Sequence, residues 1–145
     1  MRKVRFIYEK TSDDVMDLCY EKPGDSGMDV RSNEESTWIE IMEHKVFKTG
    51  ILIKEIEEGY EVQVRSKSGL AANKAVFVLN SPGTIDNGYR GEVCVILYNN
   101  GDDPVYIPKR GKIAQLVICP VVQAEGIPTK SEEVRDSDGF GSTGL

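Results

Sequence analysis

Three segments of the sequence carry side chains suited to binding or cleaving a phosphate ester. Residues 65–69 (RSKSG) place two cations and two hydroxyl groups beside the start of a possible helix, where free backbone N–H groups favour an anion. Arg135 and the glycine-rich residues 139–144 form a second set of cationic and hydroxyl groups. Taken alone, the first segment is equally compatible with a capped, solvated turn, because sequence specifies anion sites at helix starts only loosely. The second, taken alone, is more often a linker than a ligand site, because isolated glycine-rich matches are weak evidence.

The third segment, residues 83–92, carries a candidate for acid–base chemistry. Its sequence Asp86-Asn87-Gly88 is typical of a tight hairpin turn. Asp86 is therefore either a turn-forming residue that hydrogen bonds its own backbone or a general base held between two apolar strands. Composition alone does not separate these two interpretations.

Asp29 and Gln115 are polar residues with apolar neighbours. Asp29 lies within residues 26–30 (SGMDV), where a polar side chain at the edge of a strand is the ordinary interpretation. Gln115 interrupts the apolar residues 113–118. A buried amide must find hydrogen-bond partners, so Gln115 is either a tie between strands or a contact to a ligand.

The remaining sequence predicts many short strands that would position these residues. Residues 60–64 alternate with period two, whereas residues 76–79 form the continuous apolar run of a strand buried on both faces. One helix of one or two turns is expected over residues 68–74, capped by Ser68. This pattern predicts an all-β fold, a sandwich, jelly roll or barrel with at most one short helix.

Composition narrows the class of protein. The 145 residues include 18 Lys+Arg and 24 Asp+Glu, a net charge of −6 that argues against broad binding to nucleic acid. We expect no membrane span, because no apolar run approaches the roughly 20 residues that a span needs. We also expect no signal peptide, because residues 1–14 include basic residues but no apolar stretch long enough for one. Three scattered cysteines, expected to be buried where they lie in strands, and one histidine argue against a disulfide framework or a zinc site. The cytoplasm is therefore the expected location, or the host cytoplasm if the source is viral.

Each of these segments is a weak signal alone, but their order along one chain is specific. In that order, five segments resemble the five motifs of the trimeric deoxyuridine triphosphatase (dUTPase) family. The matching segments are residues 26–30, 67–71, 80–92, 110–116 and 135–144. The resemblance implies a jelly-roll or distorted β-barrel subunit over residues 1–130 and a flexible C-terminal arm, residues 131–145, that carries the lid motif. It also implies a homotrimer whose active sites are shared between subunits.

The activity implied by the resemblance is hydrolysis of dUTP to dUMP and pyrophosphate, assisted by Mg²⁺. This reaction limits uracil incorporation into DNA and supplies dUMP for dTMP synthesis. By matching position, Asp86 activates the water that attacks the α-phosphorus in line, and Gln115 holds phosphate oxygens. Asp29 accepts hydrogen bonds from water on Mg²⁺ without touching the metal, so no residue is a direct metal ligand.

The resemblance also implies substrate contacts along the chain. Phosphate contacts come from Lys67, Ser68 and Gly69, and uracil contacts from Asn80, Gly83, Thr84 and Ile85. Tyr89 lies under the sugar and excludes a ribose 2′-hydroxyl. In the arm, Phe140 covers the uracil ring, and Arg135, Ser142 and Thr143 hold the terminal phosphates. Gly141 is a further substrate contact of the arm.

The second motif departs from the family, which normally has Arg where this chain has Lys67. Lysine cannot reproduce a bidentate guanidinium fork. Either Lys67 serves with weaker geometry or Arg65 shares the role, since both lie on one side if the strand continues past residue 65.

Three other functions compete with this reading of the motifs. The related dCTP deaminases need a catalytic Glu at the position that alignment gives to Ile96, which cannot move protons. A non-catalytic nucleotide sensor would not need both carboxylates and the whole fifth motif. A purely structural jelly roll would not need residues 139–144 after its last strand.

Overall fold

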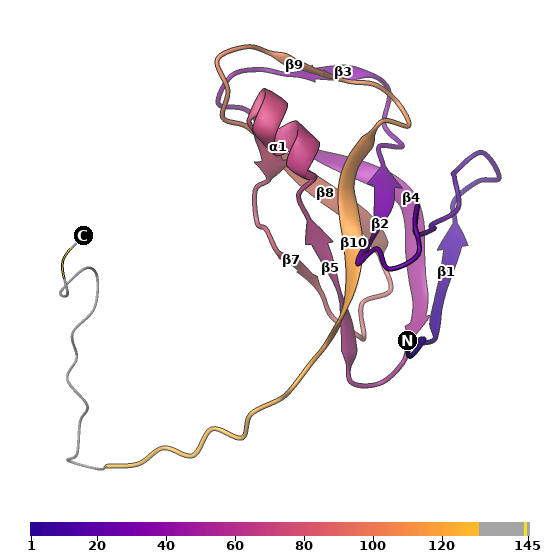
Figure 1. Cartoon of the computed structure of the whole chain (residues 1–145), viewed down its shortest axis with the longest axis vertical. Helices are drawn as coiled ribbons and strands as arrows, with labels where there is room; N and C mark the ends of the chain where they lie inside the picture. Colours follow the sequence, from indigo (N-terminus) through magenta and orange to yellow (C-terminus); the bar gives the residue numbers. More distant parts are fainter. Residues whose placement is uncertain (131–143, 145) are drawn as a thin grey trace.

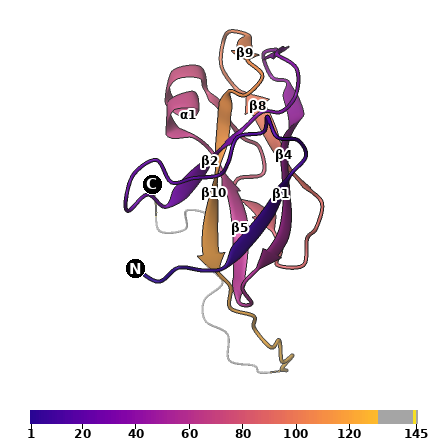
Figure 2. The same cartoon turned by 90° about the vertical axis from the view of Figure 1, so that its right-hand side faces the viewer.

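The chain folds as a sandwich of antiparallel β-sheets (Figures 1 and 2). The structure is a computed structural model that describes residues 1–130 and 144. The first sheet has the order β1-β4-β8-β6, the second has the order β2-β10-β5-β7, and β3 and β9 form a separate two-stranded ribbon. The prediction of a mostly β chain with one short helix is confirmed.

The strands and the helix have the following bounds. The first sheet contains β1 (Phe6–Lys10), β4 (His44–Ile56), β8 (Glu92–Asn99) and β6 (Val76–Val78). The second sheet contains β2 (Gly27–Arg31), β10 (Lys112–Pro120), β5 (Tyr60–Arg65) and β7 (Gly83–Ile85). The ribbon is formed by β3 (Thr37–Ile39) and β9 (Val105–Ile107), and the helix is α1 (Ser68–Lys74).

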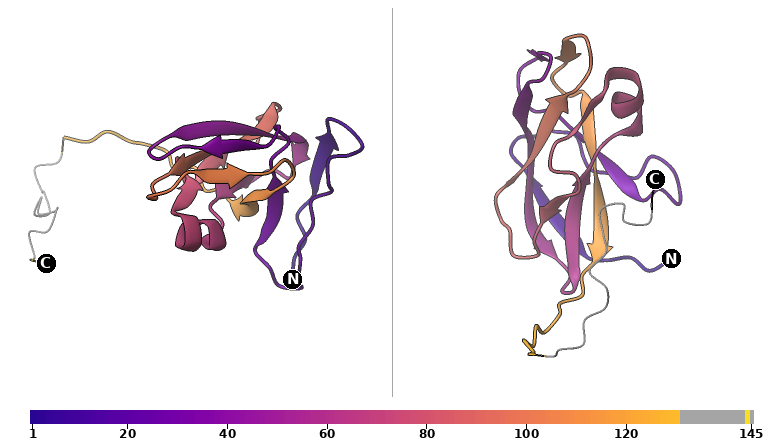
Figure 3. Two further views of the ribbon diagram at one scale, coloured as in Figure 1. Left: turned by 90° about the horizontal axis from the view of Figure 1, so that it is seen from above. Right: turned by 90° about the vertical axis from the view of Figure 1, so that its left-hand side faces the viewer.

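The core lies between the two sheets (Figure 3) and is built from alternate residues of each strand. In β5, Val62 and Val64 are buried while Gln63 and Arg65 lie on the outer face, which confirms the predicted alternation. The expectation that residues 76–79 are buried on both faces is wrong within one chain. Val76 and Val78 face the core, but Leu79 is exposed.

Two local predictions are also corrected. Helix α1 begins at Ser68, but its N-cap is Lys67 and no side chain caps it. Ser68 therefore does not cap the helix. Cys94 is exposed rather than buried, because Val93 and Val95 point into the core and the residue between them points outward.

The chain leaves the sandwich at the end of β10. Residues 121–130 are exposed and run away from the sheets (Figure 1). No helix of the described residues has the length and apolar character needed to cross a bilayer.

Candidate active site

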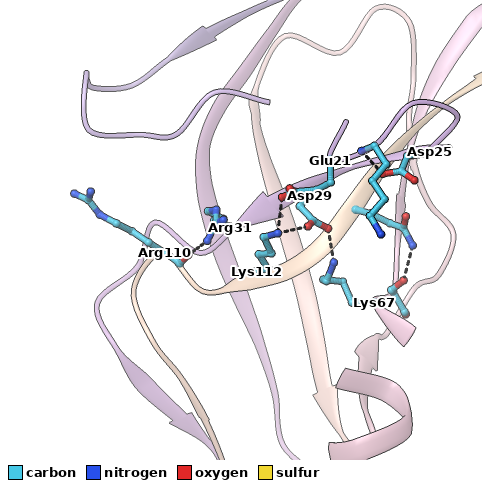
Figure 4. A network of polar contacts seen from close by, with 10 residues as sticks. Glu21, Asp25, Asp29, Arg31, Lys67, Arg110 and Lys112 are labelled. Atoms are coloured by element: carbon cyan, nitrogen blue, oxygen red, sulfur yellow. Dashed lines mark hydrogen bonds and ion pairs between the residues drawn. The ribbon is translucent and has the colours of Figure 1, made fainter. Parts of the chain in front are cut away.

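Asp29 lies between two lysines on the outer face of the second sheet (Figure 4). Lys67 contacts its Oδ1 atom, and Nζ of Lys112 lies 2.8 Å from its Oδ2 atom. Nζ of Lys112 also lies 2.6 Å from Oε1 of Glu21. Two cations and two carboxylates thus form one chain of ion pairs.

These contacts decide the charge state of Asp29. Burial by itself raises the pKa of this carboxyl, but the hydrogen bonds from Lys112 and Lys67 outweigh that effect and lower the pKa below its usual value. Asp29 in turn raises the pKa of Lys112, with a further contribution from Glu21. At neutral pH Asp29 is therefore ionised and paired with both lysines.

Strand pairing brings the cluster together. Gln115 in β10 is the register partner of Asp29 in β2 and of Arg65 in β5. Directly opposed residues of antiparallel strands share a face, so Asp29 and Gln115 lie side by side. Lys67 follows two residues after the end of β5 and reaches the same place.

The side chain of Gln115 ties β10 to the segment after β5. Its Nε2 atom donates a hydrogen bond to the backbone carbonyl of Ser66 at 3.1 Å. On its other side lies Gly27, where an added Cβ would be only 2.2 Å from Oε1 of Gln115. The glycine of the first motif is therefore the residue that leaves room for the amide of the fourth.

Arg65 points along the sheet, away from the Asp29 cluster. Its Nη2 atom donates to Oε1 of Gln63 at 2.8 Å and to Sγ of Cys119 at 3.3 Å. Strand β5 ends at Arg65. Of the two cations of this segment, Lys67 faces Asp29 in this conformation and Arg65 does not.

A hollow of about 190 Å³ lies next to the third motif. Its lining includes Asp86 and Tyr89 from the motif and Cys94 from β8. A turn is present, because the Tyr89 N–H donates to the Asp86 carbonyl at 3.0 Å. The prediction that it closes a hairpin is wrong, because β7 pairs with β5 whereas β8 pairs with β4 and β6. Asp86 is exposed at this hollow and is not shielded between apolar strands, so that part of the prediction is wrong.

The side chains of Tyr89 and Asn87 fix the wall of the hollow. The Tyr89 hydroxyl donates to the backbone carbonyl of Glu92 at 2.9 Å, and a Cβ at Gly91 would lie 2.4 Å from that hydroxyl oxygen. Asn87 donates through Nδ2 to three backbone carbonyls, those of Ile56 and Glu57 at 3.2 and 3.0 Å and that of Tyr60 at 3.0 Å. The turn is thereby anchored to the connection between β4 and β5.

The other residues predicted at the site are distributed between these two places. Asn80 lies against Gly83, where an added Cβ would be 3.3 Å from its Nδ2 atom. Ser68 and Gly69 are exposed at the start of α1, and Thr84 and Ile85 line the hollow. The predicted arm residues Arg135, Phe140, Gly141, Ser142 and Thr143 lie outside the described residues.

Sequence reasoning missed three residues at these places. Lys112 lies within the fourth motif and was available as a signal, since it follows a glycine and precedes an apolar run. Glu21 gives no local signal, because it reaches Lys112 only through the pairing of β2 with β10. Glu92 lines the hollow and accepts a hydrogen bond from the Gly50 N–H at 2.8 Å.

The described residues contain no cluster of three or more His, Cys, Asp or Glu side chains that could hold a metal ion. Asp29 is already paired with two lysines. A Mg²⁺ ion that keeps its waters and is held by substrate phosphates fits this donor set, whereas a protein cage does not.

The cluster around Asp29 and the hollow beside Asp86 define a candidate nucleotide site on an antiparallel β scaffold. A model of the dUTPase family matches residues 13–144. A deoxyuridine 5′-triphosphate nucleotidohydrolase of Hydrogenobaculum sp. (strain Y04AAS1) is 44% identical over 144 residues, covering 98% of this chain and 99% of that protein. One from Chlamydia pneumoniae is 48% identical over 129 residues, covering 86% and 88%. The chain belongs to the dUTPase family.

Solved structures support the same fold. A mutant dUTPase of Staphylococcus bacteriophage 80alpha with dUpNHpp gives a TM-score of 0.83 at 24% identity, covering 97% of this chain and 99% of that one. A mutant dUTPase of phage phi11 of S. aureus, with a structural Mg(II) ion, gives 0.78 at 23% identity, covering 90% and 99%. At these identities the comparison concerns the fold alone.

Proposed function

We propose that this chain hydrolyses dUTP to dUMP and pyrophosphate, with Asp86 as the base that activates the attacking water. We assign Asp86 as the base because it lines the hollow together with Tyr89. An exposed carboxylate at such a wall can reach a water molecule beside a bound nucleotide.

The nucleoside occupies the hollow. Tyr89 lies under the deoxyribose, where its ring leaves no room for a ribose 2′-hydroxyl. Asn80 and the backbone from Gly83 to Asp86 hydrogen bond the imide edge of uracil. Cytosine has the opposite donor pattern at that edge, so these groups also set the selectivity against dCTP.

The triphosphate lies against the cluster around Asp29. Lys67, Ser68, Gly69 and Gln115 hold phosphate oxygens, and dispersal of negative charge there lowers the barrier to in-line attack on the α-phosphorus. Lys67 carries the cationic role at this position, supported by its contact with Asp29, while Arg65 is engaged by Gln63 and Cys119.

Magnesium is held by substrate phosphates and water, with Asp29 accepting hydrogen bonds from that water. When bound, the ion neutralises charge on the phosphates. The protein supplies the fixed anion that orients its hydration shell, and it keeps that anion ionised through two lysines.

A complete site needs more than one copy of the chain. Asp86 follows β7, whose Ile85 pairs with Val62, whereas Lys67 lies beyond the other end of β5. From residue 61, opposite Asp86, to residue 67 the strand rise of about 3.3 Å per residue gives a separation of about 20 Å. A phosphate oxygen accepts a hydrogen bond within about 3 Å, which is far less than this separation. The Asp86 and the Lys67 that act on one nucleotide therefore come from different copies.

We take the assembly to be a homotrimer with shared sites, in which residues 1–130 form the β domain and residues 131–145 an arm that closes over another copy. The exposed segment 121–130 carries Val122, which is 94% exposed, and Ile127, which is 78% exposed. Apolar side chains on an extended segment are suited to packing on a second chain. In the arm, Phe140 covers uracil and Arg135, Gly141, Ser142 and Thr143 contact the substrate.

The reaction takes place in the cytoplasm in this proposal, or in the host cytoplasm for a viral source. Its support is the presence of three free cysteines, Cys19, Cys94 and Cys119, which suit a reducing compartment. There it limits uracil in DNA and supplies dUMP for dTMP synthesis.

Pyrophosphate release from dUTP, dCTP, dTTP and UTP, measured with Mg²⁺ or with EDTA, tests the proposal. We expect rapid release from dUTP with Mg²⁺, slow release from the other nucleotides, and loss of activity with EDTA. A solution mass measurement on the same sample is expected to give three chains. Equal hydrolysis of dUTP and dCTP would contradict the assignment of the uracil contacts.

A further inference from the structure

Lys112 contacts both carboxylates of the ion-pair cluster in Figure 4, which sets it apart from Lys67. Its Nζ atom lies 2.8 Å from Oδ2 of Asp29 and 2.6 Å from Oε1 of Glu21. Lys67 contacts the other oxygen of Asp29, Oδ1. The two lysines therefore hold the two oxygens of one carboxylate, and only Lys112 has a second carboxylate behind it among the described residues.

A β-bulge brings Lys112 to this face. Gln115 pairs with Asp29 and Ala114 with Val30, but Lys112 pairs with Arg31, so one extra residue of β10 lies between these pairs. In a regular strand Lys112 would be on the core side, because three positions separate it from Gln115 and side chains alternate between faces. Ile113 and Ala114 are both buried, as expected where the alternation is interrupted.

We propose that Lys112 is a positioning residue for dUTP hydrolysis, which keeps Asp29 in place while Lys67 exchanges Oδ1 of Asp29 for an oxygen of the substrate phosphate. The proposal rests on the roles given to Asp29 and Lys67 under Proposed function.

The charges of the cluster explain why such a residue is needed. Glu21, Asp29, Lys67 and Lys112 sum to zero without substrate. When a triphosphate draws Lys67 away, Asp29, whose side chain is only 16% exposed, loses one of its two cations. A largely buried carboxylate left without a partner is costly, so the exchange is feasible because Lys112 remains.

The ion pair with Glu21 keeps Lys112 in place when the substrate binds. The incoming phosphates attract both lysines, but Lys112 would have to leave two carboxylates and Lys67 only one. The structure thus distinguishes a mobile cation that meets the substrate from an anchored cation that holds Asp29.

Binding to the full-length chain tests the proposal with two probes, the non-hydrolysable triphosphate dUpNHpp and the nucleoside deoxyuridine. We expect Lys112→Met to weaken dUpNHpp binding about tenfold and to leave deoxyuridine binding within about twofold. Lys112→Arg is expected to restore the binding of dUpNHpp. The matched control is Lys109→Met, which removes an ion pair of 2.7 Å with Glu35 outside the site and is expected to change neither probe.

A double-mutant cycle separates positioning from a general loss of charge. Once Lys67→Met has removed the exchanging lysine, adding Lys112→Met should change the affinity for dUpNHpp by less than about twofold. Full additivity of the two losses of dUpNHpp affinity would overturn the proposal. Two results for Lys112→Met would also overturn it: equal weakening of deoxyuridine and dUpNHpp binding, or a melting temperature so low that the variant is unfolded in the assay. If Lys67→Met alone leaves dUpNHpp binding unchanged, the assignment of Lys67 under Proposed function fails instead, and the inference fails with it.

Discussion

At the scale of single residues, the two carboxylates of the site differ in their electrostatic surroundings. Asp29 is paired with two lysines, which lower its pKa although burial alone would raise it. Asp86 is exposed at the hollow, and the ion pairs of the described residues do not include it. A carboxylate that is held by cations is a poor proton acceptor, so these surroundings favour Asp86 as the base and Asp29 as a fixed anion.

Replacement of Asp86 by Asn should abolish most turnover without preventing binding. The amide keeps the size of the side chain but cannot accept the proton from water, and a general base contributes about 10²–10⁴-fold. We expect kcat to fall by about that factor, while the affinity for dUpNHpp changes by less than about threefold. Stopped-flow pyrophosphate release and titration with dUpNHpp measure the two quantities, and turnover near the wild-type rate would rule out Asp86 as the base.

Replacement of Asp29 by Asn should cost stability in a pH-dependent manner. Because the folded pKa of Asp29 lies below its ordinary value of 3.8, the carboxylate stabilises the fold above that pH and loses this effect as the pH falls through the folded pKa. We expect Asp29→Asn to lower the free energy of unfolding by about 1–3 kcal/mol near neutral pH. The difference from wild type should shrink below about pH 4.

Urea unfolding at fixed protein concentration over this pH range measures the difference. The concentration must be held fixed because the stability of an oligomer depends on it. A destabilisation that stays constant from neutral to acid pH would show that the charge of Asp29 does not stabilise the fold.

At the scale of structural elements, three adjacent strands set the geometry around Asp29, where we propose that the phosphates bind. Strands β2, β10 and β5 lie side by side in that order, with Gln115 of β10 between Asp29 and Arg65. The Gln115 amide reaches across to the Ser66 carbonyl, and Gly27 of β2 leaves the space that it occupies. A side chain added to β2 at this point must therefore displace a group in β10.

Replacement of Gly27 by Ala tests this coupling between strands. The new Cβ would lie 2.2 Å from Oε1 of Gln115, so the flexible amide has to move and loses its hydrogen bond to Ser66. We expect a stability loss of about 1 kcal/mol and a decrease of roughly tenfold in kcat/KM. Gly126→Ala is the matched control, because nothing lies within 4 Å of its added Cβ.

Thermal unfolding and steady-state kinetics of the two glycine variants supply the comparison. Equal kcat/KM values for Gly27→Ala, Gly126→Ala and wild type would mean that the position of the Gln115 amide does not matter to the reaction.

The elements also show which features could be predicted from the sequence. The turn from Asp86 to Tyr89 and the alternation of residues 60–64 are set by local residue types, and both are present. That the turn joins strands of two different sheets instead of closing a hairpin could not be read from the same residues. The pairing of β2 with β10 joins residues about 85 positions apart in sequence, and a bulge shifts its register at Lys112. The contacts of Lys112 and Glu21 depend on that pairing, so no local pattern predicts them.

Exposure was the other feature that local pattern did not predict. Leu79 and Cys94 lie in apolar runs, but Leu79, directly after β6, and Cys94, in β8, are both exposed. An apolar run predicts burial on both faces, but in one chain only one face is covered. In the proposed assembly, a second copy could supply the missing cover.

At the scale of the whole molecule, Asp86, the proposed base, and Lys67, the proposed phosphate contact, lie at opposite ends of β5. Ile85, next to Asp86, pairs with Val62 near the start of this strand, while Lys67 follows its last residue. The segment 121–130 leaves the sandwich altogether (Figure 1). The proposal of sites shared between copies rests on this separation and on the extended segment.

Mixing two inactive variants tests whether the sites are shared. Asp86→Asn keeps Lys67, and Lys67→Met keeps Asp86. If a site draws these two residues from different chains, it is intact when a Lys67→Met chain supplies Asp86 and an Asp86→Asn chain supplies Lys67. With random mixing of equal amounts, about a quarter of the sites regain both residues. Co-refolded mixtures should therefore recover about a quarter of wild-type kcat, well above either variant alone.

Asp86→Asn mixed with the double variant lacking both residues should recover nothing, because no chain then supplies the base. If the first mixture is no more active than its components, each site takes both residues from one chain, and the separation along β5 must be bridged in another way.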